Sequence, residues 1–217
     1  MLAIVVLGGE LEPPVRLEEW RRQACLVVAA DGGAQRALDM GLMPDVVIGD
    51  MDSLEPSALV RLRSQGAAAE VHPQGKDETD AELAVRAALA RGATELVILC
   101  ALGGQLDHTL ANVLMLGAPG LEGRAVLASG SVEVRLIRSD TEFAGSPGDM
   151  ISLLPLGDPV VGVRTEGLAY PLLDEQLPAG FARGVSNVFL GERATVRLRD
   201  GALLAIHTRR TESAKES

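Results

Sequence analysis

The feature that most constrains the fold is a series of short apolar runs separated by segments with helical spacing. The runs are rich in Val, Ile and Leu and contain few polar residues. They lie at residues 2–7, 26–29, 45–48, 69–71, 96–100 and 125–128. Nearly uniform hydrophobicity over so short a length is typical of parallel strands that are covered on both faces.

The segments between these runs have the period of amphipathic helices. They span residues 16–24, 34–40, 56–64, 79–91 and 107–116. In the fourth, Leu83, Ala87 and Ala90 form an apolar stripe, and Glu82 lies one turn before Arg86. Strands and helices in alternation predict an α/β fold, with a doubly wound, mostly parallel sheet over residues 1–138.

The pattern changes after about residue 138. Glycine and proline recur every few residues, and the apolar segments become short and alternate with polar positions. This texture predicts a small antiparallel β-sandwich or barrel over residues 139–217. Within it, Asp200-Gly201 separates two alternating runs at 194–199 and 202–207, which predicts a hairpin closed by a type I′ turn.

Charge and composition narrow the possible partners. The 217 residues are enough to bury a large core, and 20 basic against 30 acidic side chains give a net charge of −10. A field of this sign disfavours nucleic acid or an anionic membrane surface as the main partner. No apolar run is long enough to span a bilayer or to form a signal peptide. The two cysteines, Cys25 and Cys100, lack a CxxC spacing, so we expect reduced thiols and a cytoplasmic location.

Aspartates follow four consecutive predicted strands. The segments concerned are Asp31-Gly32-Gly33, Gly49-Asp50-Met51-Asp52-Ser53, Gly75-Lys76-Asp77-Glu78-Thr79-Asp80 and Leu102-Gly103-Gly104-Gln105-Leu106-Asp107-His108. In open α/β sheets, ligands bind beyond the carboxyl ends of the strands. The sequence therefore predicts one acidic rim, with glycines that let the backbone approach a ligand.

The Asp50-x-Asp52 pair is the strongest indication of a metal. Two carboxylates two residues apart in an extended chain share a face, and without a cation they would repel each other. Together with Asp31 and Asp80 at neighbouring strand ends, they predict a Mg²⁺ or Mn²⁺ site, since all the candidate ligands are oxygen atoms. Magnesium in such sites also takes phosphate oxygens as ligands. Lys76 lies beside the acidic cluster in sequence, where its positive charge could neutralise phosphate.

The residues around the predicted fifth helix are open to two interpretations. Asp107 precedes an apolar helical run, so it serves equally well as a helix N-cap or as a site residue. A lone histidine such as His108 at a helix start is more often a local hydrogen-bonding residue than a general base. Gly103-Gly104 could offer backbone amides to phosphate, although the chain contains no Walker A sequence.

Five segments in this order resemble the thiamine pyrophosphokinase family over nearly the whole chain. They are Asp31-Gly32-Gly33-Ala34, Gly49-Asp50-Met51-Asp52-Ser53, Lys76-Asp77-Glu78-Thr79-Asp80, Gly103-Gly104-Gln105-Leu106-Asp107-His108 and Gly184-Val185-Ser186-Asn187. The resemblance implies transfer of a pyrophosphoryl group from ATP to thiamine, which gives thiamine diphosphate and AMP. It also implies a Mg²⁺-dependent homodimer with active sites at the subunit interface.

The resemblance assigns roles to particular residues. Asp50, Asp52 and Asp80 resemble the metal ligands. The residues expected around the nucleotide and the reacting centre are Asp31, Gly32, Gly33, Lys76, Asp77, Thr79, Gly103, Gly104, Gln105, Asp107 and His108. The stretch from Gly167 to Tyr170 resembles the thiamine-site strand, so Tyr170 is expected to stack on the pyrimidine, with Ser186 and Asn187 on its polar edge. Either Asp77 or Asp107 is expected to accept the hydroxyl proton.

One position departs from the family pattern. The glycine pair is commonly followed by arginine in this family, and here it is followed by Gln105. An uncharged amide can hydrogen-bond a phosphate or a ribose, but it cannot make a charge-assisted contact.

Three other functions fit parts of the pattern. A related pyrophosphokinase acting on a hydroxymethyl pterin would use the same aspartates, whereas a Mg²⁺-dependent phosphohydrolase would need only the Asp-x-Asp pair. A non-catalytic thiamine or nucleotide sensor is the third, for which Gln105 is the hint. Tyr170 and Ser186-Asn187 favour the thiamine enzyme over the pterin enzyme.

Overall fold

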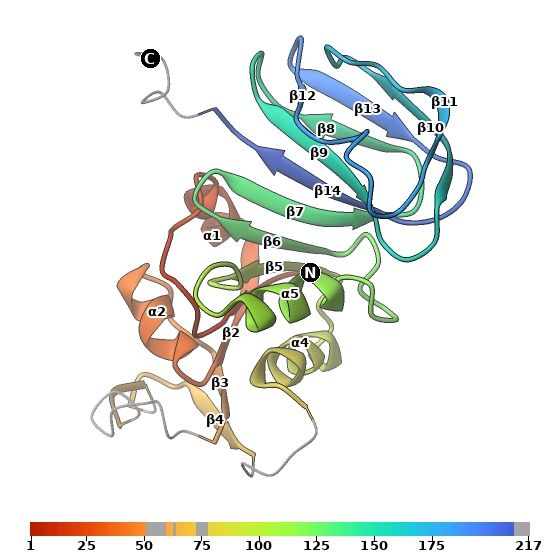
Figure 1. Cartoon of the computed structure of the whole chain (residues 1–217). Coiled ribbons are helices and arrows are strands. Elements are labelled where there is room, and N and C mark those ends of the chain that lie inside the picture. The colour runs from red at the N-terminus through yellow and green to blue at the C-terminus, as the bar shows by residue number, and fades with distance from the viewer. Residues whose placement is uncertain (51–59, 63, 73–77, 211–217) are drawn as a thin grey trace. The chain divides into compact units, whose positions relative to one another are not determined.

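The computed structural model describes residues 1–50, 60–62, 64–72 and 78–210 (Figure 1). The chain divides into two compact units. Unit 1 comprises Met1–Met115 with Arg124–Gly130, and unit 2 comprises Leu116–Gly123 with Ser131–Ser217. Among the described residues, no helix has the length and apolar character needed to cross a membrane.

Unit 1 is built on six parallel strands. These are β1 (Leu2–Val6), β2 (Ala24–Ala30), β3 (Val46–Gly49), β4 (Ala68–Val71), β5 (Glu95–Leu99) and β6 (Ala125–Ser129). They lie in the order β6-β5-β1-β2-β3-β4, and every neighbouring pair is parallel. The predicted doubly wound sheet is therefore confirmed, since β2–β4 are added on one side of β1 and β5–β6 on the other.

The helices of unit 1 are α1 (Leu17–Gln23), α2 (Gly33–Asp39), α4 (Asp80–Ala90) and α5 (Leu106–Met115). Buried side chains of α1 and α2 pack against Ile4, Val6, Val97 and Leu99 of the sheet, while α4 contacts β1, β2 and β3. The predicted helix at 56–64 falls mostly outside the described residues, although residues 60–62 and 64 are helical.

Unit 2 is an antiparallel β-sandwich. Its strands are β7 (Val132–Ile137), β8 (Thr141–Ala144), β9 (Met150–Pro155), β10 (Val160–Glu166), β11 (Leu173–Leu177), β12 (Asn187–Val188), β13 (Arg193–Arg197) and β14 (Leu203–Thr208). One set lies in the order β12-β9-β14-β7 and the other in the order β11-β10-β13-β8. Both sets contribute side chains to one buried cluster that contains Phe143, Leu153, Val163, Val196 and Leu203. The predicted sandwich is confirmed.

The predicted hairpin around Asp200-Gly201 is wrong. Strand β13 pairs with β10 and β8, whereas β14 pairs with β7 and β9, so the two strands belong to different sheets. The expected type I′ turn does not form either, because Gly201 has a positive φ of +103° but Asp200 does not; the Gly201 N–H donates to the Asp200 carboxylate. Asp200 pairs with Val161 of β10, so the chain crosses from one sheet to the other.

Candidate active site

A cavity of about 920 Å³ lies in unit 1 where several strands end. The loops after β1, β2, β3 and β5 contribute Gly9, Asp31, Asp50 and Gly103, and α4 and α5 close the other side. The strand order reverses between β1 and β5, and such a switch point is where open α/β sheets bind ligands.

Asp31 lies at the floor of this cavity with its backbone in the left-handed region, at φ +41°. Its N–H donates to the Ile48 carbonyl at 2.7 Å, and its carbonyl accepts from the Ala34 N–H at 3.0 Å. Asp31 is only 8% exposed, and within the described residues its Oδ1 atom has no hydrogen-bond partner. A buried carboxylate oxygen in this condition is costly, so the geometry favours a bound cation or donor.

Two glycines let the strand ends pack closely at this floor. A Cβ on Gly33 would lie 2.1 Å from the Val6 carbonyl oxygen, and one on Gly49 would lie 2.8 Å from the Asp31 Cβ. Both distances are far below van der Waals contact, so only glycine fits. Gly32 also lines the cavity, at the N-cap of α2.

Two of the three predicted metal ligands line the cavity. Asp50 follows β3, and Asp80 is the first residue of α4. The third, Asp52, lies outside the described residues, as do Lys76 and Asp77. The described part of the chain contains no group of three or more His, Cys, Asp or Glu side chains that could hold a metal. The oxygen-only character of Asp50 and Asp80 fits Mg²⁺.

Thr79 lines the cavity but also has a structural task. Its Oγ1 accepts from the Glu82 N–H at 3.2 Å, and the Glu82 carboxylate accepts from the Thr79 N–H at 2.7 Å. This reciprocal capping box explains why α4 begins at Asp80.

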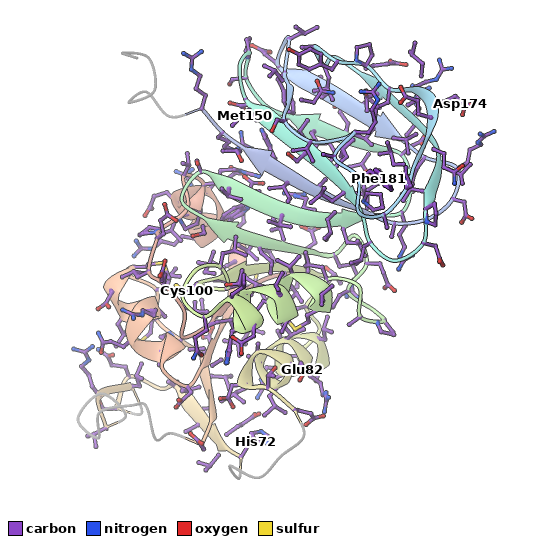
Figure 2. All side chains as sticks on the ribbon, in the orientation of Figure 1. His72, Glu82, Cys100, Met150, Asp174 and Phe181 are labelled. Atoms are coloured by element: carbon purple, nitrogen blue, oxygen red, sulfur yellow. The ribbon has the colours of Figure 1, made fainter. Side chains whose placement is uncertain are left out.

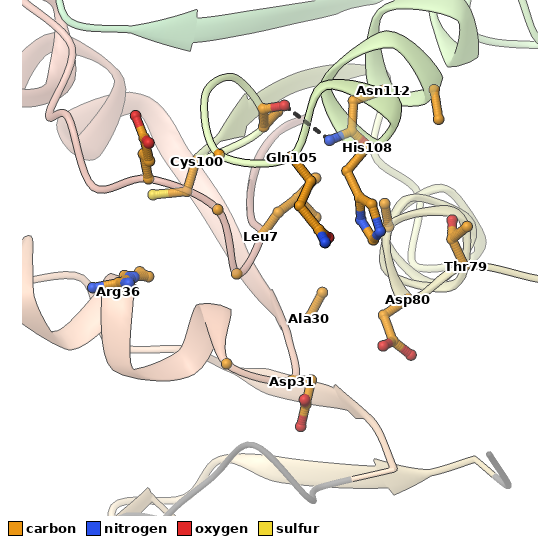
Figure 3. A pocket seen from close by; sticks show the side chains of 18 of the residues that line it. Leu7, Ala30, Asp31, Arg36, Thr79, Asp80, Cys100, Gln105, His108 and Asn112 are labelled. Carbon is orange, nitrogen blue, oxygen red and sulfur yellow. Dashed lines mark hydrogen bonds between the residues drawn. The ribbon is translucent and has the colours of Figure 1, made fainter.

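Three residues at the start of α5 line the cavity and are exposed: Gln105, Asp107 and His108. Figure 3 shows the Gln105 and His108 side chains extending into it near Asp80. The helix begins at Leu106, so Asp107 lies inside the first turn and is not the N-cap. Its Oδ1 accepts from the His108 N–H at 2.9 Å. Gly103 and Gly104 both have positive φ, at +85° and +71°, and both line the cavity.

Sequence reasoning missed several lining residues. They are Leu7, Gly8, Gly9 and Glu10 after β1, Arg36 on α2, Cys100 and Ala101 after β5, and Ala111 and Asn112 on α5. The pair Gly8-Gly9 was a usable signal, because it directly follows the first apolar run. Asn112 anchors the loop after β5 by donating to the Ala101 carbonyl at 2.9 Å.

Cys100 lies at the end of β5, at the position labelled in Figures 2 and 3. Its backbone is left-handed, at φ +54°. Burial raises the pKa of the thiol to about 11, and the nearby positive charge of Arg36 offsets this only in part. A pKa in this range keeps the Cys100 thiol protonated at neutral pH.

The predicted thiamine-side residues lie in unit 2. Tyr170 is 63% exposed, and Ser186 is exposed with a left-handed backbone at φ +57°. Asn187 is different, since it is only 6% exposed and both polar atoms of its side chain make hydrogen bonds within the protein. Its Oδ1 accepts from the N–H groups of Tyr170 and Val188 at 2.9 and 3.0 Å, and its Nδ2 donates to the Tyr170 carbonyl at 2.6 Å. Asn187 thus holds the backbone that carries Tyr170.

The fold and cavity together define a doubly wound α/β protein with a ligand-sized cavity at the switch point of its sheet and an additional β-sandwich. Two family models match the chain: "Thiamin pyrophosphokinase, catalytic domain" over residues 17–123 and "Thiamin pyrophosphokinase, vitamin B1 binding domain" over residues 136–203. The chain belongs to the thiamine pyrophosphokinase family.

Individual relatives agree with this assignment. Thiamine pyrophosphokinase 1 of Oryza sativa subsp. japonica is 30% identical over 222 residues, which cover 90% of this chain and 82% of the relative. Thiamine pyrophosphokinase of Bacillus subtilis is 26% identical over 215 residues, which cover 94% of this chain and 97% of the relative. The crystal structure of the Bacillus subtilis protein has the same fold, with a TM-score of 0.86 at 22% identity. The match covers 97% of this chain and 100% of the crystallised chain.

Proposed function

We propose that this protein transfers the pyrophosphoryl group of ATP to the hydroxyethyl oxygen of thiamine, giving thiamine diphosphate and AMP. Membership of the thiamine pyrophosphokinase family supports this reaction. The structural observation that carries the site is the cavity at the switch point, where the buried Asp31 has an oxygen without a partner in the described residues and Asp50 and Asp80 line the same space.

The reaction requires alignment more than covalent chemistry by the protein. The thiamine hydroxyl oxygen attacks the β-phosphorus, the bond from that phosphorus to the α–β bridging oxygen breaks, and AMP leaves with that oxygen. Asp77 or Asp107 accepts the hydroxyl proton. Lys76 and the Gly103-Gly104 loop bind the phosphates, with Gly32, Gly33, Thr79, Gln105 and His108 around the nucleotide.

Asp50, Asp52 and Asp80 are the residues we propose to hold Mg²⁺. When bound, the ion supplies positive charge to the phosphates. Two observations support this assignment: Asp50 and Asp80 line one cavity, and they offer oxygen atoms alone.

Thiamine recognition is proposed for the second domain, residues 139–217, and ATP binding for residues 1–138. The exposed Tyr170 ring is available to stack on the pyrimidine, and Ser186 lies one residue before the Asn187 anchor. In this assignment Ser186 contacts the polar edge of thiamine, and Asn187 acts through Tyr170.

The proposed assembly is a homodimer with active sites at the subunit interface. Leu106, Leu110 and Leu114 support it, because they recur one turn apart on α5 and are more than half exposed. We further propose a cytoplasmic enzyme with neither nucleic acid nor membrane as a partner, which the net charge of −10 supports.

The test is to incubate the protein with ATP, Mg²⁺ and thiamine and to measure AMP. We expect AMP and thiamine diphosphate in equal amounts, both dependent on thiamine. Inorganic phosphate without thiamine would instead indicate a phosphohydrolase. AMP formed only with a hydroxymethyl pterin would indicate the related pyrophosphokinase, and no product would indicate a sensor.

The choice of base is tested by Asp77→Asn and Asp107→Asn. The variant that loses turnover while keeping its affinity for Mg²⁺ identifies the base. A loss of Mg²⁺ affinity in both variants would contradict this part of the proposal.

A further inference from the structure

Among the described residues, permanent positive charge is scarce around the cavity. Six carboxylates line it, contributed by Glu10, Asp31, Asp50, Glu78, Asp80 and Asp107. Among the described residues that line it, Arg36 alone is a lysine or an arginine. A polyphosphate entering this space meets a strongly negative surface, so each cation that faces it has a large effect.

Arg36 also differs from several other arginines of this acidic chain, which are held in ion pairs. Arg16, Arg86 and Arg91 form ion pairs with nearby glutamates, and the partner of Arg86 is Glu78 at the cavity edge. Within the described residues, Arg36 forms no ion pair or hydrogen bond, although it is half-buried on α2. An unpaired guanidinium in a protein of net charge −10 is available for an anionic ligand.

Arg36 lines the cavity from α2. It lies one helical turn after Gly32, which also lines the cavity, and its field acts on the buried Cys100 thiol. In Figure 3 it extends from α2 on the side opposite to Asp80 and His108. Gln105 lines the same space but carries no charge.

We propose that Arg36 contacts the polyphosphate of the nucleotide and supplies charge that Gln105 cannot. This inference rests on the proposed function, because it takes ATP as the ligand. A guanidinium suits this task because its planar fork can donate two parallel hydrogen bonds to one phosphate group.

The test compares three variants: Arg36→Gln, Arg36→Lys, and the double variant that combines Arg36→Gln with Gln105→Arg. The affinity of each for ATP and for adenosine is measured by calorimetry. We expect Arg36→Gln to weaken ATP binding about 10- to 100-fold, the range of a lost charge-assisted hydrogen bond, and to leave adenosine binding unchanged. Arg36→Lys should lose less because it keeps the charge. Adding Gln105→Arg should recover a measurable part of the loss, since both side chains face one cavity.

Arg22→Gln is the matched control. It removes the same charge from an exposed position of α1 that does not line the cavity, so ATP affinity should change less than about twofold. Thermal unfolding of each variant verifies folding. If Arg36→Gln does not fold, the comparison uses Arg36→Lys instead. The ATP affinity of Arg36→Lys is then compared with that of the double variant Arg36→Lys with Gln105→Arg.

Unchanged ATP affinity in a folded Arg36→Gln variant would overturn the inference, and so would equal losses for ATP and adenosine. A separate result would show that the proposed function is wrong while this inference holds. ATP binding that depends on Arg36, without thiamine-dependent AMP in the unchanged protein, would overturn the reaction and leave the phosphate contact in place.

Discussion

Replacing Asn187 with alanine tests the anchoring of the thiamine side of the protein. The substitution removes three hydrogen bonds, two to the Tyr170 backbone and one from the Val188 N–H. Each contributes about 0.5–1.5 kcal/mol net, and the backbone groups lose their partner at a buried position. We therefore expect the free energy of unfolding of unit 2 to fall by about 2–4 kcal/mol.

The same substitution should weaken thiamine binding selectively. Without the Asn187 side chain, the Tyr170 backbone loses two of its fixed contacts, and the ring must be ordered when thiamine binds. An ordering cost of about 1.4 kcal/mol raises the KM for thiamine about tenfold. The KM for ATP should stay unchanged, because the cavity proposed for ATP lies in unit 1.

The assay combines urea unfolding followed by circular dichroism with steady-state kinetics at varied thiamine and varied ATP. Val160→Ala is the control, since Val160 is fully buried in unit 2 and its truncation costs about 2 kcal/mol without touching the anchor. Two results would refute the reasoning. One is an equal rise in the thiamine KM in both variants, and the other is a rise for Asn187→Ala with no loss of stability, as expected if Asn187 contacted thiamine directly.

Substitutions at three further positions, Asp31, His207 and Thr79, test stability and activity separately. Asp31→Asn should leave the free energy of unfolding unchanged or higher while reducing thiamine-dependent AMP formation at least about tenfold, and lower stability with full activity would contradict this. Burial lowers the pKa of His207 although its hydrogen bond to Asp149 opposes the shift, so the unfolded chain takes up a proton near pH 6.5 that the folded chain does not. Stability should therefore fall as pH drops below about 6.5, and His207→Asn should flatten this dependence in unfolding curves measured from pH 5 to 7.5. Thr79→Ala should cost about 1 kcal/mol in thermal unfolding through loss of the α4 cap, whereas Thr79→Ser should cost almost nothing.

The architecture could be predicted from the sequence because its cause is local. A strand covered on both faces must be apolar at every position, and β3 and β6 are buried along their whole length. The connection at Asp200-Gly201 could not be predicted in the same way. An Asp-Gly pair favours a type I′ turn, but whether that turn forms and β13 and β14 pair depends on the strands β7–β10 that compete for their edges.

The acidic rim could be predicted for a similar reason. Parallel strands end at one edge of a sheet, so Asp31, Asp50, Asp80 and Asp107 were expected to converge, and all four line the cavity. The direction in which an individual side chain points is a tertiary property. Asn187 looks like a ligand-binding amide in sequence, yet it turns inward because the Tyr170 backbone leaves polar groups that need partners.

Backbone strain gives independent support to the location of the site. Asp31 and Cys100 both adopt left-handed conformations, which cost a non-glycine residue about 1–3 kcal/mol. Both are the first residues after their strands, and both line the cavity beside the switch point. Close packing at Gly33 and Gly49 fixes the neighbouring backbone, so the strain at Asp31 cannot relax without separating the strand ends. The strain at Asp31 and its Oδ1, which has no partner in the described part of the chain, therefore have one explanation, a rigid floor that directs this carboxylate toward a ligand.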